Sequence, residues 1–163
     1  MSKVSLQNCV QSVRWMNNSI TYEQYLAENG SLTYTFKGCS MNPMLKQGRD
    51  LFTVKAKTAE RCRKYDVVLY RRPPNRFVLH RIVKVREKDY VIIGDNCIKK
   101  EYGITDEDII GILTGFVRKG KDYSVSDPRY RLYVHIWCDF LCLRIGLLRL
   151  RALAGRIKRK LKG

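Results

Sequence analysis

The feature that most constrains the fold is a series of short runs rich in β-branched and aromatic residues, with no helix-length gap between them. The runs are Leu32–Phe36, Leu51–Ala56, Val67–Tyr70, Phe77–Val85, Tyr90–Ile93 and Ile109–Val117. Turn-forming sequences such as Pro73-Pro74-Asn75 separate them. Six or seven short strands without helical connections predict a mainly β fold, built as a curled antiparallel sheet or a partly open barrel.

Helical periodicity flanks this β segment on both sides. Before it, the spacing of Val4, Val10, Val13, Ile20 and Leu26 predicts two short N-terminal helices, the second starting near Thr21 and ending at Asn29-Gly30. After it, Asp127-Pro128 marks a boundary, and an amphipathic helix is expected beyond. We therefore predict three parts: a helical segment over 1–30, a β domain over 31–127 and a helical tail over 128–163.

The charge of the chain is strongly basic. The sequence contains 32 Lys and Arg against 15 Asp and Glu, a formal net charge of +17. Such a field attracts polyanions, either nucleic acid or the anionic leaflet of a membrane. Eight of the basic residues and no acidic residue lie between 143 and 163.

The predicted tail helix combines this charge with an apolar stripe. The stripe consists of Leu132, Ile136, Leu143, Leu147, Leu150, Ala154 and Leu161, with Arg144, Arg151 and Lys158 on one flank and Arg149 and Arg156 on the other. A basic amphipathic helix of this kind is typical of segments that lie on an anionic membrane surface. We expect the tail to bind such a surface, with nonspecific binding of nucleic acid as the less favoured alternative.

The sequence predicts neither a transmembrane segment nor a metal site. The uncharged stretch from Leu132 to Cys138 is far below the ~20 residues that cross a bilayer, and no signal segment is recognised at the N-terminus. The six cysteines include no Cys-x-x-Cys pair, and His80 and His135 are far apart in sequence. We expect a cytoplasmic protein, either free or peripheral on the inner face of the membrane, with no metal or cofactor.

Three short motifs suggest nucleophilic catalysis. Ser40 opens a Ser-Met-Asn-Pro sequence, His80 is followed by Arg81 on a predicted strand, and Gly94-Asp95-Asn96 forms a predicted turn. A serine hydroxyl is a poor nucleophile unless a base accepts its proton and a third group orients that base. The chain offers a candidate for each of these roles.

The segment from Gly38 to Leu45 resembles the nucleophile box of type I signal peptidases and their LexA-type relatives, which reads Ser-Met-x-Pro. Three further resemblances follow in the same order, over roughly residues 34–117: Gly48-Arg49-Asp50-Leu51, the strand from Tyr65 to Tyr70, and Gly94-Asp95-Asn96. At the position of the base this chain has His80, as in the archaeal and endoplasmic-reticulum branch, where bacterial enzymes use lysine. The resemblance implies a β fold of the signal peptidase-LexA type.

The resemblance also implies roles for individual residues. Ser40 attacks the scissile carbonyl and His80 accepts its proton. The orienting carboxylate of the His branch corresponds to Glu101, where the family has aspartate, and Asp95 is the competing candidate. Residues expected to contact the substrate are Gly38, Cys39, Met41 and Pro43. Many bacterial members carry a hydroxyl at the position of Gly38, so backbone N–H groups around the nucleophile are expected to stabilise the oxyanion here.

The activity implied is that of a serine endopeptidase that cleaves a peptide or preprotein after small residues, for example by processing a leader peptide. Two alternatives remain open. One is a LexA-like regulator that cleaves itself, for instance at Ala152-Leu153-Ala154, or that associates with nucleic acid. The other is a β module that has lost catalysis and serves for docking.

Overall fold

The computed structural model describes residues 21–160 except residue 75, and within this range the side chains of 152 and 155–160 are not described. The first of the two predicted N-terminal helices lies outside the described residues. The second is α2 (Tyr22–Asn29). The Thr21 side chain accepts a hydrogen bond from the backbone of Gln24, and the Gln24 side chain accepts one from Thr21 in return. This capping box begins the helix, and Gly30 ends it in a left-handed conformation.

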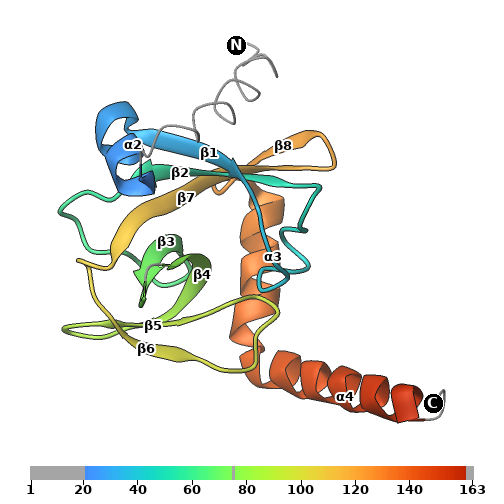
Figure 1. The fold of residues 1–163 in the computed structure, drawn as a ribbon. Helices are drawn as coiled ribbons and strands as arrows, with labels where there is room; N and C mark the ends of the chain where they lie inside the picture. The colour runs from blue at the N-terminus through green and yellow to red at the C-terminus, as the bar shows by residue number, and fades with distance from the viewer. Residues whose placement is uncertain (1–20, 75, 161–163) are drawn as a thin grey trace.

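The strands form one antiparallel sheet, which confirms the mainly β prediction (Figure 1). They are β1 (Ser31–Thr35), β2 (Leu51–Ala56), β3 (Val67–Arg72), β4 (Arg76–Val85), β5 (Tyr90–Ile93), β6 (Glu101–Ile104), β7 (Ile109–Arg118) and β8 (Lys121–Ser124). The order is β1-β2-β7-β3-β4-β5-β6, with β8 paired to β7. All six predicted runs are strands, whereas β6 and β8 were not predicted.

The sheet is open, because β1 and β6 stand at the two ends of its strand order. Register shifts interrupt the pairing of β2 with β7, β3 with β7, β4 with β5 and β5 with β6. Such irregularities bend a strand and increase its twist. In Figure 1, β1, β2 and β7 lie in the upper part of the sheet. The sheet curls, so that β4, β5 and β6 lie beneath these strands.

The main hydrophobic core lies inside this curl. It includes Leu26 of α2, Phe52 and Val54 of β2, and Phe116 of β7. Met41, Met44 and Leu45 add side chains from the turn that follows β1, and each is at most 2% exposed. The turn that carries Ser40 is therefore anchored in the core by the residues that follow the serine.

The tail forms two helices, not the single helix that was predicted. They are α3 (Pro128–Asp139) and α4 (Leu141–Lys160), and the chain leaves helical geometry at Phe140. Tyr130, Val134 and Cys138 of α3 pack onto the main core. In Figure 1, α3 runs along the sheet and α4 extends away from it. Among the described residues, no helix has both the length and the apolarity that crossing a bilayer requires.

Candidate active site

Ser40 lies in a turn that packs against the Gly94-Asp95-Asn96 turn. The backbone N–H of Asn96 donates a hydrogen bond of 2.7 Å to the carbonyl oxygen of Ser40. The side chain of Met41 is fully buried beneath the turn. Two segments more than fifty residues apart in sequence are therefore held together by a backbone contact at the candidate nucleophile.

Gly94 shows how close Ser40 and His80 approach. A Cβ atom at Gly94 would lie 2.6 Å from the carbonyl oxygen of Ser40, 2.8 Å from Nε2 of His80 and 2.8 Å from Sγ of Cys97. Real Cβ atoms do not make contacts this short. The absence of a side chain at residue 94 lets the imidazole and the serine turn share the same small space.

Ser40 and His80 also line one groove. It has a volume of about 930 Å³, and Gly38, Cys97 and Glu101 lie on its surface as well. Ser40 is half-buried, and His80 is only 4% exposed. Within the described part of the chain, the Ser40 hydroxyl makes no hydrogen bond, including none to His80. In enzymes without substrate the nucleophile and base are often farther apart than in the reacting complex, so the arrangement is compatible with catalysis.

The imidazole of His80 is oriented by Glu101. Nδ1 of His80 lies 2.9 Å from Oε1 of Glu101. A carboxylate only accepts hydrogen bonds, so Nδ1 carries a proton and Nε2 is left as the acceptor on the side of Gly94 and Ser40. This is the tautomer that a general base for Ser40 requires.

Glu101 is itself held by two side chains of β3. The hydroxyl of Tyr70 donates to Oε2 of Glu101 at 2.8 Å, and Nε of Arg72 donates to the same oxygen at 2.9 Å. Arg72 makes a second contact through Nη2 to Oε1. The carboxylate therefore has little freedom to turn away from His80.

Burial lowers the pKa of His80 below its ordinary value, and the negative charge of Glu101 offsets this only in part. Removing a group from water disfavours its charged form, which for histidine is the protonated ring. His80 is therefore neutral near pH 7. A neutral imidazole with a free Nε2 can accept a proton.

Asp95, the other candidate orienter, makes no hydrogen bond with His80. It binds Arg81, whose Nε and Nη2 donate to its two carboxylate oxygens at 2.9 and 2.8 Å. Arg81 and Asp95 are both completely buried. Tyr133 and Trp137 of α3 also bind Asp95, through its carboxylate and its carbonyl oxygen respectively. Asp95 thus joins β4 to α3.

The residues expected to contact a substrate lie in three different environments. Gly38 lines the groove. Cys39 and Pro43 are exposed but are not part of the groove lining, and Met41 is in the core. The buried side chain of Met41 anchors the turn, so it is not available to contact a substrate in the groove.

The candidate donor to an oxyanion is the N–H of Ser40 itself. The N–H of Gly38 donates to Oε1 of Gln47 at 2.7 Å, and the N–H of Asn42 donates to the carbonyl oxygen of Cys39 at 3.2 Å. Among the described residues, none accepts from the N–H of Ser40. A free N–H next to the attacking hydroxyl is well placed for the charge that develops on the carbonyl oxygen.

Sequence reasoning missed Tyr70, Arg72 and the role of Arg81. A signal for the first two was present, because Tyr70 and Arg72 alternate along β3 and so share a face. Their relation to Glu101 depended on strand order, since β3 pairs with β4 and β6 lies beyond β5. No local pattern contains that information.

The described residues include no group of three or more His, Cys, Asp or Glu side chains that could hold a metal ion. Neither a protein-family model, nor a curated protein, nor a solved structure matches this chain.

Proposed function

We propose that this chain is a serine endopeptidase in which Ser40 is the nucleophile, His80 the general base and Glu101 the group that orients His80. The observation that carries the proposal is the 2.9 Å contact between Nδ1 of His80 and Glu101. It leaves Nε2 facing the turn of Ser40 across Gly94. An Nδ1 bound to a carboxylate and an Nε2 open toward the serine turn are what a general base needs.

In the proposed reaction, His80 accepts the proton of the Ser40 hydroxyl as its oxygen attacks the scissile carbonyl. Glu101 stabilises the imidazolium that forms, and the N–H of Ser40 donates to the oxyanion. His80 then transfers the proton to the leaving amine, which departs and leaves an acyl group on Ser40. Water, activated by the same imidazole, hydrolyses the acyl group and restores the enzyme.

The resemblance of Ser40-Met41-Asn42-Pro43 and its companion motifs to signal peptidases and LexA-type proteins supports this assignment, and so does the open, curled antiparallel sheet. By this analogy the substrate is a peptide or preprotein that is cleaved after a small residue, such as a leader peptide removed in the cytoplasm. This step of the proposal rests on analogy, because a fold hosts many functions.

Labelling with a serine-reactive phosphonate tests the proposal. The wild-type chain is expected to be labelled at Ser40, and Ser40→Ala and His80→Ala are expected to lose the label. Ser124→Ala is the matched control, since Ser124 lies in β8 outside the groove. If the folded wild-type chain takes no label that depends on Ser40, the protease proposal is wrong and the docking module is favoured.

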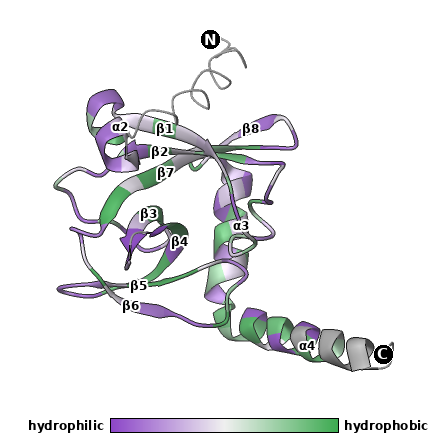
Figure 2. Ribbon diagram, in the orientation of Figure 1, coloured by the Kyte–Doolittle hydropathy of each residue, from purple (hydrophilic) through white to green (hydrophobic). Residues whose placement is uncertain are grey.

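We further propose that α3 and α4 hold the protein on an anionic membrane surface. The predicted apolar stripe is exposed: Leu132, Ile136, Leu143, Leu147 and Leu150 are 56–66% exposed. Figure 2 shows hydrophobic residues along α4 where it leaves the sheet. Apolar area and basic charge together are what a helix needs to bind at the lipid interface.

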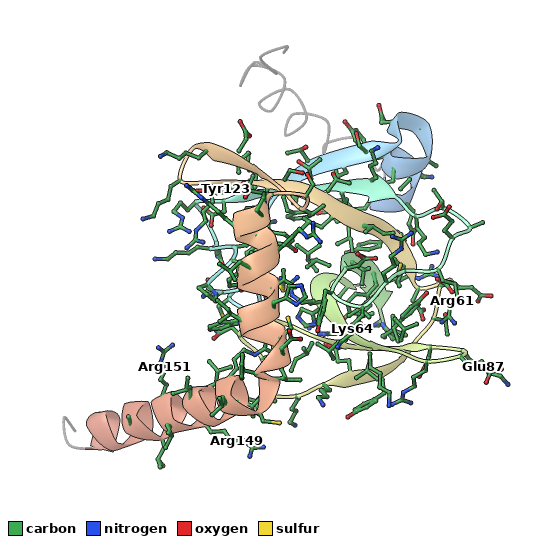
Figure 3. All side chains as sticks on the ribbon, turned by 180° about the vertical axis from the view of Figure 1, so that it is seen from behind. Arg61, Lys64, Glu87, Tyr123, Arg149 and Arg151 are labelled. Carbon is green, nitrogen blue, oxygen red and sulfur yellow. The ribbon has the colours of Figure 1, made fainter. Side chains whose placement is uncertain are left out.

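The arginines of α4 do not all contribute to such a surface. Arg149 and Arg151 are exposed, and Figure 3 shows them extending from opposite sides of α4 into open space. Arg144, assigned to the basic flank from the sequence, is instead 4% exposed and lies 3.9 Å from Asp95. Arg144 packs against the turn that contains Asp95, because it lies in the first turn of α4, close to the β sheet.

Flotation with anionic liposomes tests this surface in the full-length chain. The variant Leu143→Ser/Leu147→Ser/Leu150→Ser is expected to remain in the soluble fraction, and Arg149→Glu/Arg151→Glu to lose flotation at low salt. Lys121→Glu, an exposed substitution in β8, is the control. Equal flotation of all variants would contradict the proposal.

The two alternative regulatory functions, self-cleavage and association with nucleic acid, are tested by different experiments. Self-cleavage at Ala152-Leu153-Ala154 would require α4 to unwind there, because these residues are helical. Intact mass after incubation detects such a cut, which Ser40→Ala would abolish. Association with nucleic acid would appear as binding that weakens steeply with salt.

A further inference from the structure

The groove beside Ser40 is larger and more apolar than a pocket for one small side chain needs to be. Its volume of about 930 Å³ lies near the upper end for sites that enclose whole small molecules. Its apolar lining includes Tyr22, Phe36, Phe52, Leu69, Phe77 and Leu79. The rings of Tyr22 and Phe77 meet edge to face at 5.1 Å. Such a surface favours bulky apolar groups.

The rim of the same groove is positively charged. Lys37, Arg72, Arg76 and Lys99 line it, and its one carboxylate is that of Glu101. Glu101 is already bound to His80, Tyr70 and Arg72. Within the described part of the chain, no carboxylate pairs with Lys37, Arg76 or Lys99. Three cations are therefore left to bind an acidic group from outside.

The positions of these cations relate to the reaction centre. Arg76 and His80 both lie on β4, four residues apart, which places their backbones about 13 Å from each other along the strand. Lys37 precedes Ser40 by three residues, and Lys99 precedes Glu101 by two. An extended peptide has the same rise per residue as a strand, so a peptide that runs along β4 places at Arg76 a side chain about four residues from the scissile bond.

We infer that the groove selects peptides that combine a bulky apolar side chain with a carboxylate about four residues from the scissile bond, bound by Arg76. This inference rests on the proposed function and extends it from the reaction to the substrate class. Lys37 and Lys99 reinforce the preference near the reaction centre, where they repel basic peptides. The carboxylate can belong to an Asp or Glu side chain or to the end of a peptide, because a cation binds both in the same way.

Binding to Ser40→Ala tests the inference independently of catalysis. A fluorescent apolar peptide is prepared with Glu, Gln or Lys four residues from the small residue at the cleavage position, on either side of it. Each version carries an amidated or a free C-terminus. We expect the Glu peptide to bind about tenfold more tightly than the Gln peptide on one side of the cleavage position. The Lys peptide is expected to bind most weakly.

A charge swap then assigns the effect to Arg76. In the Ser40→Ala background, Arg76→Glu is expected to reverse the order, so that the Lys peptide binds best. Arg131→Glu is the matched control, because Arg131 is exposed on α3 and does not line the groove. It is expected to keep the wild-type order. A preference seen only with the free C-terminus would assign the bound carboxylate to a chain end.

Different experimental results would overturn the inference and the proposed function. Equal affinity for the three peptides, or an unchanged order in Arg76→Glu, overturns the inference even if Ser40 is labelled by the phosphonate. A clear preference for the Glu peptide without any label at Ser40 supports an acidic-peptide groove and overturns the protease.

Discussion

His80 and Arg81 are consecutive residues of β4 whose side chains bind two different carboxylates. His80 contacts Glu101, and Arg81 binds both oxygens of Asp95. Because successive side chains of a strand point to opposite faces, the imidazole faces the groove and the guanidinium faces α3. The same strand thus positions the candidate base and anchors the turn that packs against Ser40.

Replacing Glu101 is expected to impair catalysis more than stability. Glu101→Gln removes the negative charge and can leave His80 in the wrong tautomer, so we expect kcat to fall by about 10³–10⁴-fold. Glu101→Asp, which keeps the carboxylate and shortens the side chain by one methylene, is expected to recover part of the activity. Glu107→Gln is the control, since Glu107 is exposed and outside the groove. A kcat near the wild-type value in Glu101→Gln would assign the orienting role to another group.

Activity is expected to depend on a neutral His80. Because burial lowers the pKa of His80 below its ordinary value of about 6.5, the ring stays neutral at pH 7 and becomes protonated only in mild acid. The value of kcat/KM should therefore be level near neutral pH and fall as pH decreases below 6.5. His135→Gln, which removes the other histidine, should leave this profile unchanged. A plateau reached only in the alkaline range would indicate a lysine base.

The same pKa shift contributes to stability with a definite sign. The unfolded chain binds a proton at His80 more readily than the folded chain does, so lowering the pH through this range favours unfolding. The contribution is fully present above about pH 6.5 and is lost as pH falls through the folded-state pKa. A His80→Ala variant should lack this part of the acid dependence in denaturant titrations.

A methyl group at residue 94 is expected to separate the reacting groups. In Gly94→Ala the new Cβ meets the carbonyl oxygen of Ser40 and Nε2 of His80 at distances below 3 Å. A displacement of about 1 Å at a reaction centre can cost 10²-fold in rate, and we expect at least that loss in kcat/KM. Gly146→Ala is the control, because a Cβ there has no neighbour within 4 Å in the part of the chain that the structure describes. If Gly94→Ala is as active as Gly146→Ala, the close approach of Ser40 and His80 has no role.

Asp95→Asn is expected to destabilise the fold. Arg81 would remain fully buried without a charged partner, and breaking a buried ion pair in this way typically costs about 3–5 kcal/mol. The substitution would also remove the negative charge near Arg144, whose Nε and Nη2 are buried and have no hydrogen-bond partner among the described residues. The midpoint of urea unfolding measures the loss. Asp122→Asn, an exposed change, should have little effect, and an equal midpoint in the two variants would contradict this account.

Local patterns in the sequence predicted several parts of the molecule correctly. The six β-rich runs are strands, and the helix from Thr21 to Asn29 forms with its cap. These features were predictable because side-chain alternation, turn residues and helix caps act over a few neighbouring residues.

The tail shows two features that such local patterns did not predict. Periodicity identified the apolar stripe but not the break at Phe140, and it placed Arg144 with the exposed arginines. Whether a helix face is buried depends on what packs against it. Here Tyr130 and Val134 face the core, and the stripe through Leu132 and Ile136 faces outward.

Residue types and spacing alone determined that this chain forms short strands, carries a basic amphipathic tail and holds a serine and a histidine in suggestive motifs. Only the tertiary structure decided which carboxylate meets His80. The register shifts between β4 and β5 and between β5 and β6 set which residues face one another across the sheet. A shift of one residue turns every later side chain to the opposite face, so Glu101 and Asp95 cannot be told apart until all the strands have paired.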